Sequence, residues 1–270
     1  MGFKVVEGSP KVGWFPASCY NGPTVITYYI GQLVSWLGGG VYPLVAAAAA
    51  PEVTTFPFGV IIGFNTDPST AVYNSTYQEE QASNVITQAT LNAKSGKVAF
   101  TEGMMTKNEK QLMIKVALIK PDCTVLQGPI YKSTNGTAPG VVTCNGVDSN
   151  GLTGMTHTAA DATLVANNNM YACRTGSNRG LYRTSYGVAT ATTPTFYSPW
   201  PYSWAIGDTF VAVNFGLGRQ YVEFGAAGVG MFFDNADGLT EAYVVNVHSM
   251  KLMTVGQEHA TFTFAAYSAI

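Results

Sequence analysis

Short apolar runs with a period of two recur along the whole chain and predict a protein built mainly of β-strands. In the clearest run, residues 111–120, both alternating faces are largely apolar, which predicts a central strand. Similar runs predict strands at 25–30, 209–215, 242–247 and 261–266. Gly, Pro, Asn and Asp residues separate the runs as turns. The pattern predicts a mainly β fold of antiparallel β-sandwich or barrel-like lobes, with the C-terminal strand paired and buried.

One segment has a helical period instead. Small and aliphatic residues recur there at i, i+3, i+4, i+7 and i+11, namely Ala82, Val85, Ile86, Ala89 and Ala93. Ser75 with Gln78, or Thr76 with Glu79, can form a capping box at the start, and Gly96 lies just beyond the end. The pattern predicts one short amphipathic helix over about residues 76–93.

A compositional change near the middle suggests two parts. Residues 133–178 are rich in Gly, Thr, Ala and Asn and have few large apolar side chains, which is typical of loops and linkers. We therefore expect an N-terminal β-rich part with the helix at 1–145 and a C-terminal β-rich part at 146–270. The segment could equally be a long excursion from a single domain.

Charge is scarce. The 14 Lys and Arg and 16 Asp and Glu residues make 11% of the chain, about half the usual fraction. Since protein interfaces are depleted in charge, other protein chains are expected to cover this surface. The sequence displays no basic cluster for nucleic acid. The charge-free stretch 12–51 is interrupted by Gly and Pro, which argues against a membrane span. The N-terminal residues lack a secretory signal pattern, so we expect synthesis in the cytoplasm.

Residues for catalysis are sparse as well. The three histidines and four cysteines show no metal-ligand spacing, and nucleophile-elbow and phosphate-loop motifs do not occur. We expect a non-enzymatic protein with neither metal nor cofactor. The cysteines are expected to be partly buried thiols, although a bridge between Cys123 and Cys144 stays open.

Aromatic residues gather in the stretch TFYSPWPYSWAIGD at 195–208. Three readings stay open: the rings fill the core, anchor a protein interface, or form a platform for sugars. The candidate interface anchors of the chain are Trp200, Tyr202, Trp204, Trp36 and Tyr42.

Two pairs of stretches resemble structural proteins of tailed-bacteriophage particles. SNRGLYRTSYGVATATT at 177–193, followed by YSWAIGDTFVAVNF at 202–215, resembles a virion pattern in which a Gly-Arg strand leads through a Thr/Ala-rich segment to a Gly-Asp turn. IGQLVSWLGGGVYPLVA at 30–46, followed by FGVIIGF at 58–64, looks like the opening pattern of small capsid decoration proteins. That pattern is a Gly turn, a strand, a Gly hairpin, a strand and an FGV strand.

The resemblance implies a capsid decoration, or cement, protein on the outside of a phage head. Its partners would be the major capsid protein and its own copies, with a homotrimer favoured. The alternatives are another virion component, such as a major capsid or tail protein, and then a carbohydrate-binding module. The most charge-poor segments, 12–51 and 184–206, are expected to be mostly buried in the fold or in subunit contacts.

Overall fold

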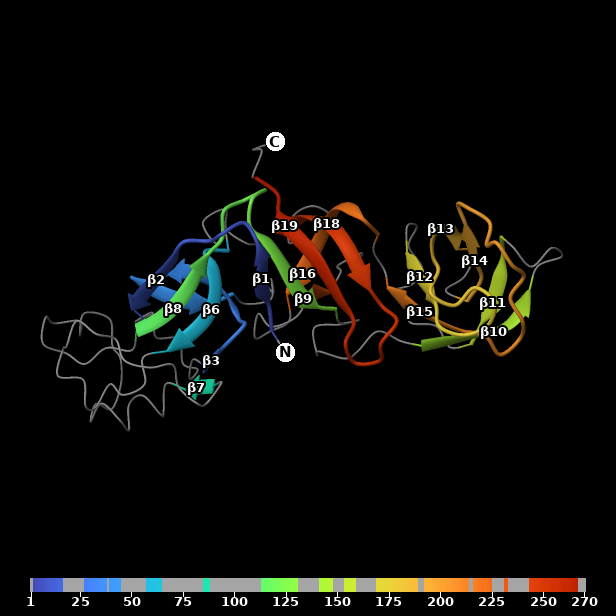
Figure 1. Ribbon diagram of the computed structural model, residues 1–270, viewed down its shortest axis with the longest axis horizontal. Helices are drawn as coiled ribbons and strands as arrows, with labels where there is room; N and C mark the ends of the chain where they lie inside the picture. Colours follow the sequence, from blue (N-terminus) through green and yellow to red (C-terminus); the bar gives the residue numbers. More distant parts are fainter. Residues whose placement is uncertain are drawn as a thin grey trace, which may run out of the picture. The chain divides into compact units, whose positions relative to one another are not determined.

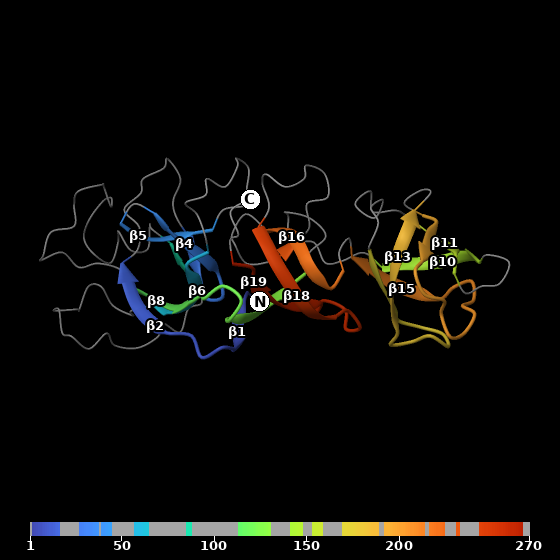
Figure 2. The same ribbon diagram turned by 90° about the horizontal axis from the view of Figure 1, so that it is seen from above.

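All regular structure in the described part of the chain is β, and every strand pair with a defined register is antiparallel. Figures 1 and 2 show the computed structural model from two sides. It describes residues 2–16, 27–37, 39–44, 57–64, 85–87, 113–130, 141–147, 153–158, 169–188, 192–213, 216–224, 231–232 and 243–266. The expected mainly β, antiparallel fold is confirmed.

The chain forms two compact units. Unit 1 comprises Met1–Gly128 and Phe224–Gly230, and unit 2 comprises Pro129–Glu223 and Met231–Ile270. The strand β10, Val141–Val147, runs across the division expected at residues 145 and 146 and lies wholly in unit 2. The Gly- and Thr-rich residues of β10 are themselves part of a sheet.

Unit 1 is organised around a five-stranded sheet with the order β2-β8-β6-β4-β5. Its strands are β2 (Val12–Pro16), β8 (Met113–Leu118), β6 (Gly59–Phe64), β4 (Leu33–Leu37) and β5 (Gly40–Pro43). The doubly apolar run does become an interior strand, since β8 pairs with β2 on one side and β6 on the other. The edge strands β2 and β5 also contact each other, so the sheet curls into a barrel-like shape around Val34, Ile61 and Ile114.

Two further strand pairs complete unit 1. The strand β1 (Lys4–Glu7) pairs with β9 (Val125–Pro129), and β3 (Thr27–Tyr29) pairs with β7 (Val85–Thr87). Because β7 lies inside 76–93, the expected helix is wrong at its centre; the rest of that range lies outside the described residues. The three consecutive residues of β7 are β-branched, which favours an extended strand, and pairing with β3 outweighs the helical stripe.

Unit 2 contains a nearly closed, barrel-like sheet. The sheet has the order β11-β10-β15-β12-β13-β14, and these yellow-green to orange strands curve round one interior in Figures 1 and 2. The strands besides β10 are β11 (Met155–His157), β15 (Thr209–Val213), β12 (Met170–Cys173), β13 (Tyr182–Val188) and β14 (Pro194–Phe196). A bridge between Gly154 and Thr195 joins β11 to β14, supported by 2.9 Å bonds from Phe196 N to Thr153 O and from His157 N to Thr192 O. The seam removes the sheet edges.

A second sheet of unit 2 carries the C-terminal strand. Within unit 2 its strands follow the order β19-β18-β16-β17 and are β19 (His259–Phe264), β18 (Tyr243–Lys251), β16 (Gly218–Phe224) and β17 (Met231–Phe232). The strand β19 pairs with β18 along its length, and Phe262 and Phe264 are buried. The expectation of a paired, buried C-terminal strand is confirmed for these residues.

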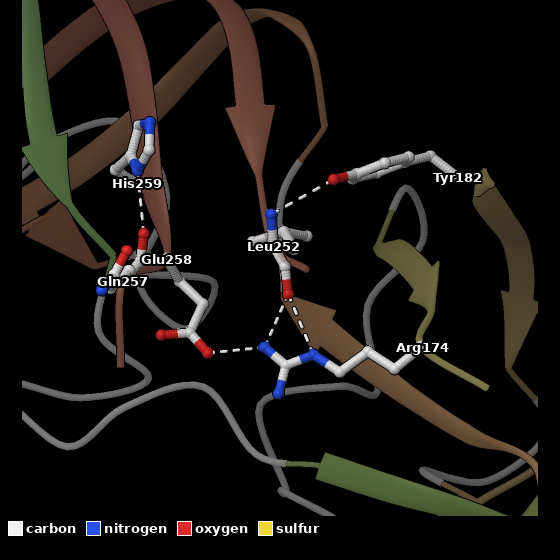
Figure 3. Close-up of polar contacts among 6 residues, drawn as sticks. All are labelled: Arg174, Tyr182, Leu252, Gln257, Glu258 and His259. Carbon is white, nitrogen blue, oxygen red and sulfur yellow. Dashed lines mark hydrogen bonds and ion pairs between the residues drawn. The ribbon is translucent and has the colours of Figure 1, made fainter. Parts of the chain in front are cut away.

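A buried arginine links the barrel to the connection between β18 and β19 (Figure 3). Arg174, which follows β12, donates from Nε and Nη2 to the Leu252 carbonyl at 3.0 and 2.6 Å. Its Nη2 also lies 2.6 Å from Glu258 Oε1, and both side chains are more than nine-tenths buried. The Tyr182 hydroxyl accepts a 3.2 Å bond from Leu252 N. These contacts fix the connection 252–258 against the barrel.

Candidate protein-binding surface

The aromatic stretch of the sequence packs against the core of the barrel in unit 2. We call residues 197–208 the plug loop, because it carries two tryptophans into the barrel interior. Trp200 and Trp204 are 1% and 3% exposed, and their rings meet edge to face with centroids 5.6 Å apart. Both also pack on Phe196 and Phe210. These two residues are core residues, so neither indole can anchor a partner or stack on a sugar as a surface ring.

Side-chain bonds from the neighbouring loop hold the backbone of the plug loop. Asn178 is fully buried; its Nδ2 donates to Tyr202 O at 2.6 Å, and its Oδ1 accepts from Tyr202 N at 3.2 Å. Asp208 Oδ2 accepts a 2.8 Å bond from Ala205 N at the end of the loop. Gly176 has φ +77° and lies so close to the Asp208 carboxylate that a Cβ would collide with it. The loop is therefore held in one conformation.

This rigid loop presents apolar and aromatic side chains outward. Tyr197, Tyr202 and Ile206 are 62%, 60% and 72% exposed. Tyr186, on the neighbouring strand β13, is also exposed and packs against Tyr197 with ring centroids 5.1 Å apart. We call Tyr186, Tyr197, Tyr202 and Ile206 the plug-loop surface. Pre-organised tyrosines suit protein binding, because little conformational entropy is lost when a partner covers them.

The other two candidate anchors lie in unit 1, on the β4–β5 hairpin. Trp36 is 45% exposed, and its ring contacts Phe15 and Phe58 at centroid distances of 6.1 and 5.6 Å. Tyr42 is half-buried and packs against the unit 1 core. Trp36 thus has partial access to a partner, whereas Tyr42 serves the fold.

A groove also runs beside β1 in unit 1. It has a volume of about 570 Å³ and is lined mainly by aliphatic side chains, among them Val5, Ile30 and Ile61. The charged residues of its lining are Lys4 and Glu7, both on β1. Ligand sites usually combine an apolar lining with a few convergent polar groups. We therefore take the plug-loop surface, whose side chains are better defined, and not this groove, as the candidate site.

Burial inside the barrel favours the neutral forms of its titratable groups. Burial raises the pKa of the Cys144 thiol, and it raises the pKa of Cys173 to about 11 with a further contribution from Asp208. Burial lowers the pKa of His157, whose Nδ1 lies 3.1 Å from the Thr158 carbonyl and therefore carries the proton. Its Nε2 is 3.5 Å from the Tyr171 hydroxyl, and burial raises the pKa of Tyr171. Thiols with raised pKa values are poor nucleophiles.

The described residues do not form a recognisable metal centre. Among them, no group of three or more His, Cys, Asp or Glu side chains is placed to hold an ion. Cys123, Cys144 and Cys173 are free cysteines, the first exposed and the others buried, while Cys19 lies outside the described residues. Within the same part of the chain, no helix has the length and hydropathy needed to cross a membrane.

Three members of the plug-loop surface, Tyr186, Tyr197 and Ile206, are not among the anchors predicted from the sequence. In β13 the buried Ser185 and the exposed Tyr186 alternate, but sequence alone does not show which face of that strand lines the barrel. Comparison of the chain with protein-family models, curated proteins and solved structures gave no match.

Proposed function

We propose that the chain is a non-enzymatic structural protein of a tailed-phage particle, which decorates the outside of the head and stabilises the shell. Its partners would be the major capsid protein and further copies of itself. The observation that carries this proposal is the plug-loop surface, because rigid exposed tyrosines on a charge-poor protein are suited to protein contacts. The plug loop would be one of its contact sites.

The resemblance to virion proteins supports the same proposal. The stretches at 177–193 and 202–215 include β13, much of the plug loop and β15. The stretches at 30–46 and 58–64 hold a Gly31 turn, β4, a Gly39 turn, β5 and β6 in the order that the decoration pattern leads one to expect. The proposed role and the candidate surface thus involve the same segments.

Two alternatives have less support. A major capsid subunit would be favoured by a helix over 76–93, but β7 occupies the centre of that range. A carbohydrate-binding module was suggested by Trp200 and Trp204, which are buried in the barrel. Decoration of the head therefore remains the function that we propose.

Cosedimentation with capsids encoded by the same genome tests the proposal. The native chain is expected to pellet with assembled heads, and Tyr197→Ser with Tyr202→Ser is expected to lower its affinity about tenfold or more, as loss of interface hot spots does. Val255→Ser is the matched control, because Val255 is an exposed apolar residue of unit 2 outside the surface. A native chain that stays in the supernatant with every head preparation would contradict the proposed function.

A further inference from the structure

Arg183 lies beside the plug loop with its guanidinium held in place. Its Cζ is 5.5 Å from the centroid of the Trp200 ring, in cation–π geometry. Its Nε donates to Pro199 O at 3.1 Å, and its Nη1 donates to Tyr182 O at 2.8 Å. Those bonds use two of the five N–H donors of a guanidinium, and Nη2 takes part in neither. The half-buried group is thus oriented in advance for a further acceptor.

Among the described barrel residues, basic side chains outnumber acidic ones. The described barrel residues between 141 and 213 include Arg174, Arg179, Arg183 and one acidic residue, Asp208. Arg174 is paired with Glu258, and Asp208 accepts a bond from within the plug loop. Arg179 is exposed on the loop that also holds Asn178. The cations that remain for a partner are Arg179 and Arg183.

We propose that the plug-loop surface binds an acidic segment of a partner protein, an inference that rests on the proposed function of the chain. Carboxylates of the partner would pair with Arg183 and Arg179, because a planar guanidinium accepts a carboxylate in a two-bond geometry. Apolar groups of the same segment would cover Tyr197, Tyr202 and Ile206. Arg and Tyr are the residues that interface centres favour, and opposite charge steers the encounter.

The chain's arginines allow a direct test, because they are few: Arg174, Arg179, Arg183 and Arg219. Their Nε–H signals can be followed by NMR in the full chain while poly-L-glutamate is added. We expect the Arg183 and Arg179 signals to move and those of Arg174 and Arg219 to stay. The shifts should weaken as salt is raised, because exposed charge pairs are screened.

Matched variants complete the test. Arg183→Gln and Arg179→Gln should each weaken binding of poly-L-glutamate by up to about fivefold, the effect of an exposed charge pair, whereas Arg219→Gln should not. Arg179 is exposed, so Arg179→Gln remains informative if Arg183→Gln fails to fold. Unchanged signals, or equal shifts at Arg219, would overturn the inference. Tighter binding of oligo(dT) or of a neutral oligosaccharide would overturn it too, in favour of those ligands.

The result can be separated from the proposed function. If the native chain binds heads, and the double variant Arg179→Gln with Arg183→Gln binds them equally at every salt concentration, the acidic-partner inference fails and decoration stands. Self-association of the native chain that Tyr197→Ser abolishes, without any response to poly-L-glutamate, would assign the surface to a second copy and also overturn the inference.

Discussion

The two most charge-poor segments of the chain are covered to different extents. In the described part of 12–51 most residues are buried or half-buried in unit 1, and Val12 and Trp36 are its exposed large apolar side chains. In 184–206 the fold buries Trp200 and Trp204 but leaves Tyr186, Tyr197 and Tyr202 exposed. Low charge therefore accompanies a covered core in unit 1, whereas in unit 2 it also accompanies exposed apolar side chains.

The difference follows from how each unit places its large rings. Trp36, Phe15 and Phe58 pack on one another in unit 1, so even the exposed indole is partly covered. In the plug loop the two indoles point into the barrel, and Asn178 fixes the backbone of Tyr202 between them. The intervening tyrosine has to face outward, because its neighbours on the loop fill the interior.

The largest expected effect is on the barrel core. Trp204→Ala should cost unit 2 about 3–5 kcal/mol, since it removes a buried ring and leaves a cavity. Hydrogen exchange should then accelerate in β12 and β15 while β6 and β8 of unit 1 keep their protection. Trp36→Ala, at a half-exposed ring, should cost only about 1 kcal/mol. Equal acceleration in both units would show that they unfold together.

The buried ion pair should come next. Glu258→Ala leaves the Arg174 charge buried without its carboxylate and should destabilise unit 2 by about 3 kcal/mol or more. Adding Arg174→Met removes that charge and should recover part of the loss. Urea unfolding of the two single variants and the double variant measures the coupling. If the double variant loses the sum of the single effects, the contact in Figure 3 is not a coupled pair.

A smaller effect is expected from the loop clamp. Asn178→Ala removes both bonds to the Tyr202 backbone and should cost about 1–3 kcal/mol, because two backbone groups of the loop lose their partner. Protease cleavage within 199–206 should become faster, and the affinity for heads should fall with it. Ser198→Ala, in an exposed residue of the same loop, is the control. Cleavage at the native rate would mean that the tryptophans alone fix the tyrosines.

The smallest effect is the response of the barrel to acid. Because burial lowers the folded-state pKa of His157, its unfolded form binds more protons in the window below about pH 6.5. The contribution of neutral His157 to the free energy of unfolding is complete above that pH. It declines as pH falls towards the folded-state pKa, by at most about 1.4 kcal/mol per pH unit. His157→Gln should flatten this decline in urea unfolding at pH 7 and pH 5. If the variant loses as much stability between pH 7 and pH 5 as the native chain does, other titratable groups cause the decline.

Long apolar alternation identified several strands in advance. The runs at 111–120 and 209–215 contain β8 and β15, and the runs at 242–247 and 261–266 overlap β18 and β19, since alternation over that length is hard to reconcile with another structure. By contrast, β10, β11 and β12 lie in the segment 133–178, whose composition predicts loops. Hydrogen bonding to β15, and between β10 and β11, stabilises these strands although their residues do not locally favour an extended strand.

The candidate surface was predictable only in part. Proline-spaced aromatics marked the plug loop, and Tyr202 has the exposure that an anchor requires. The inward turn of Trp200 and Trp204 was one of the alternatives left open, because a loop has no period that tells core from surface. Arg183 carried no signal, since its position depends on the Trp200 ring and the Pro199 carbonyl.

Cryo-electron microscopy of the particle whose genome encodes the chain tests the central claim most directly. The account predicts density for the chain on the outside of the head, with Tyr197, Tyr202 and Ile206 covered by another protein chain. Density in which residues 197–208 face solvent, while the Trp36 side of unit 1 makes the contact, would contradict it.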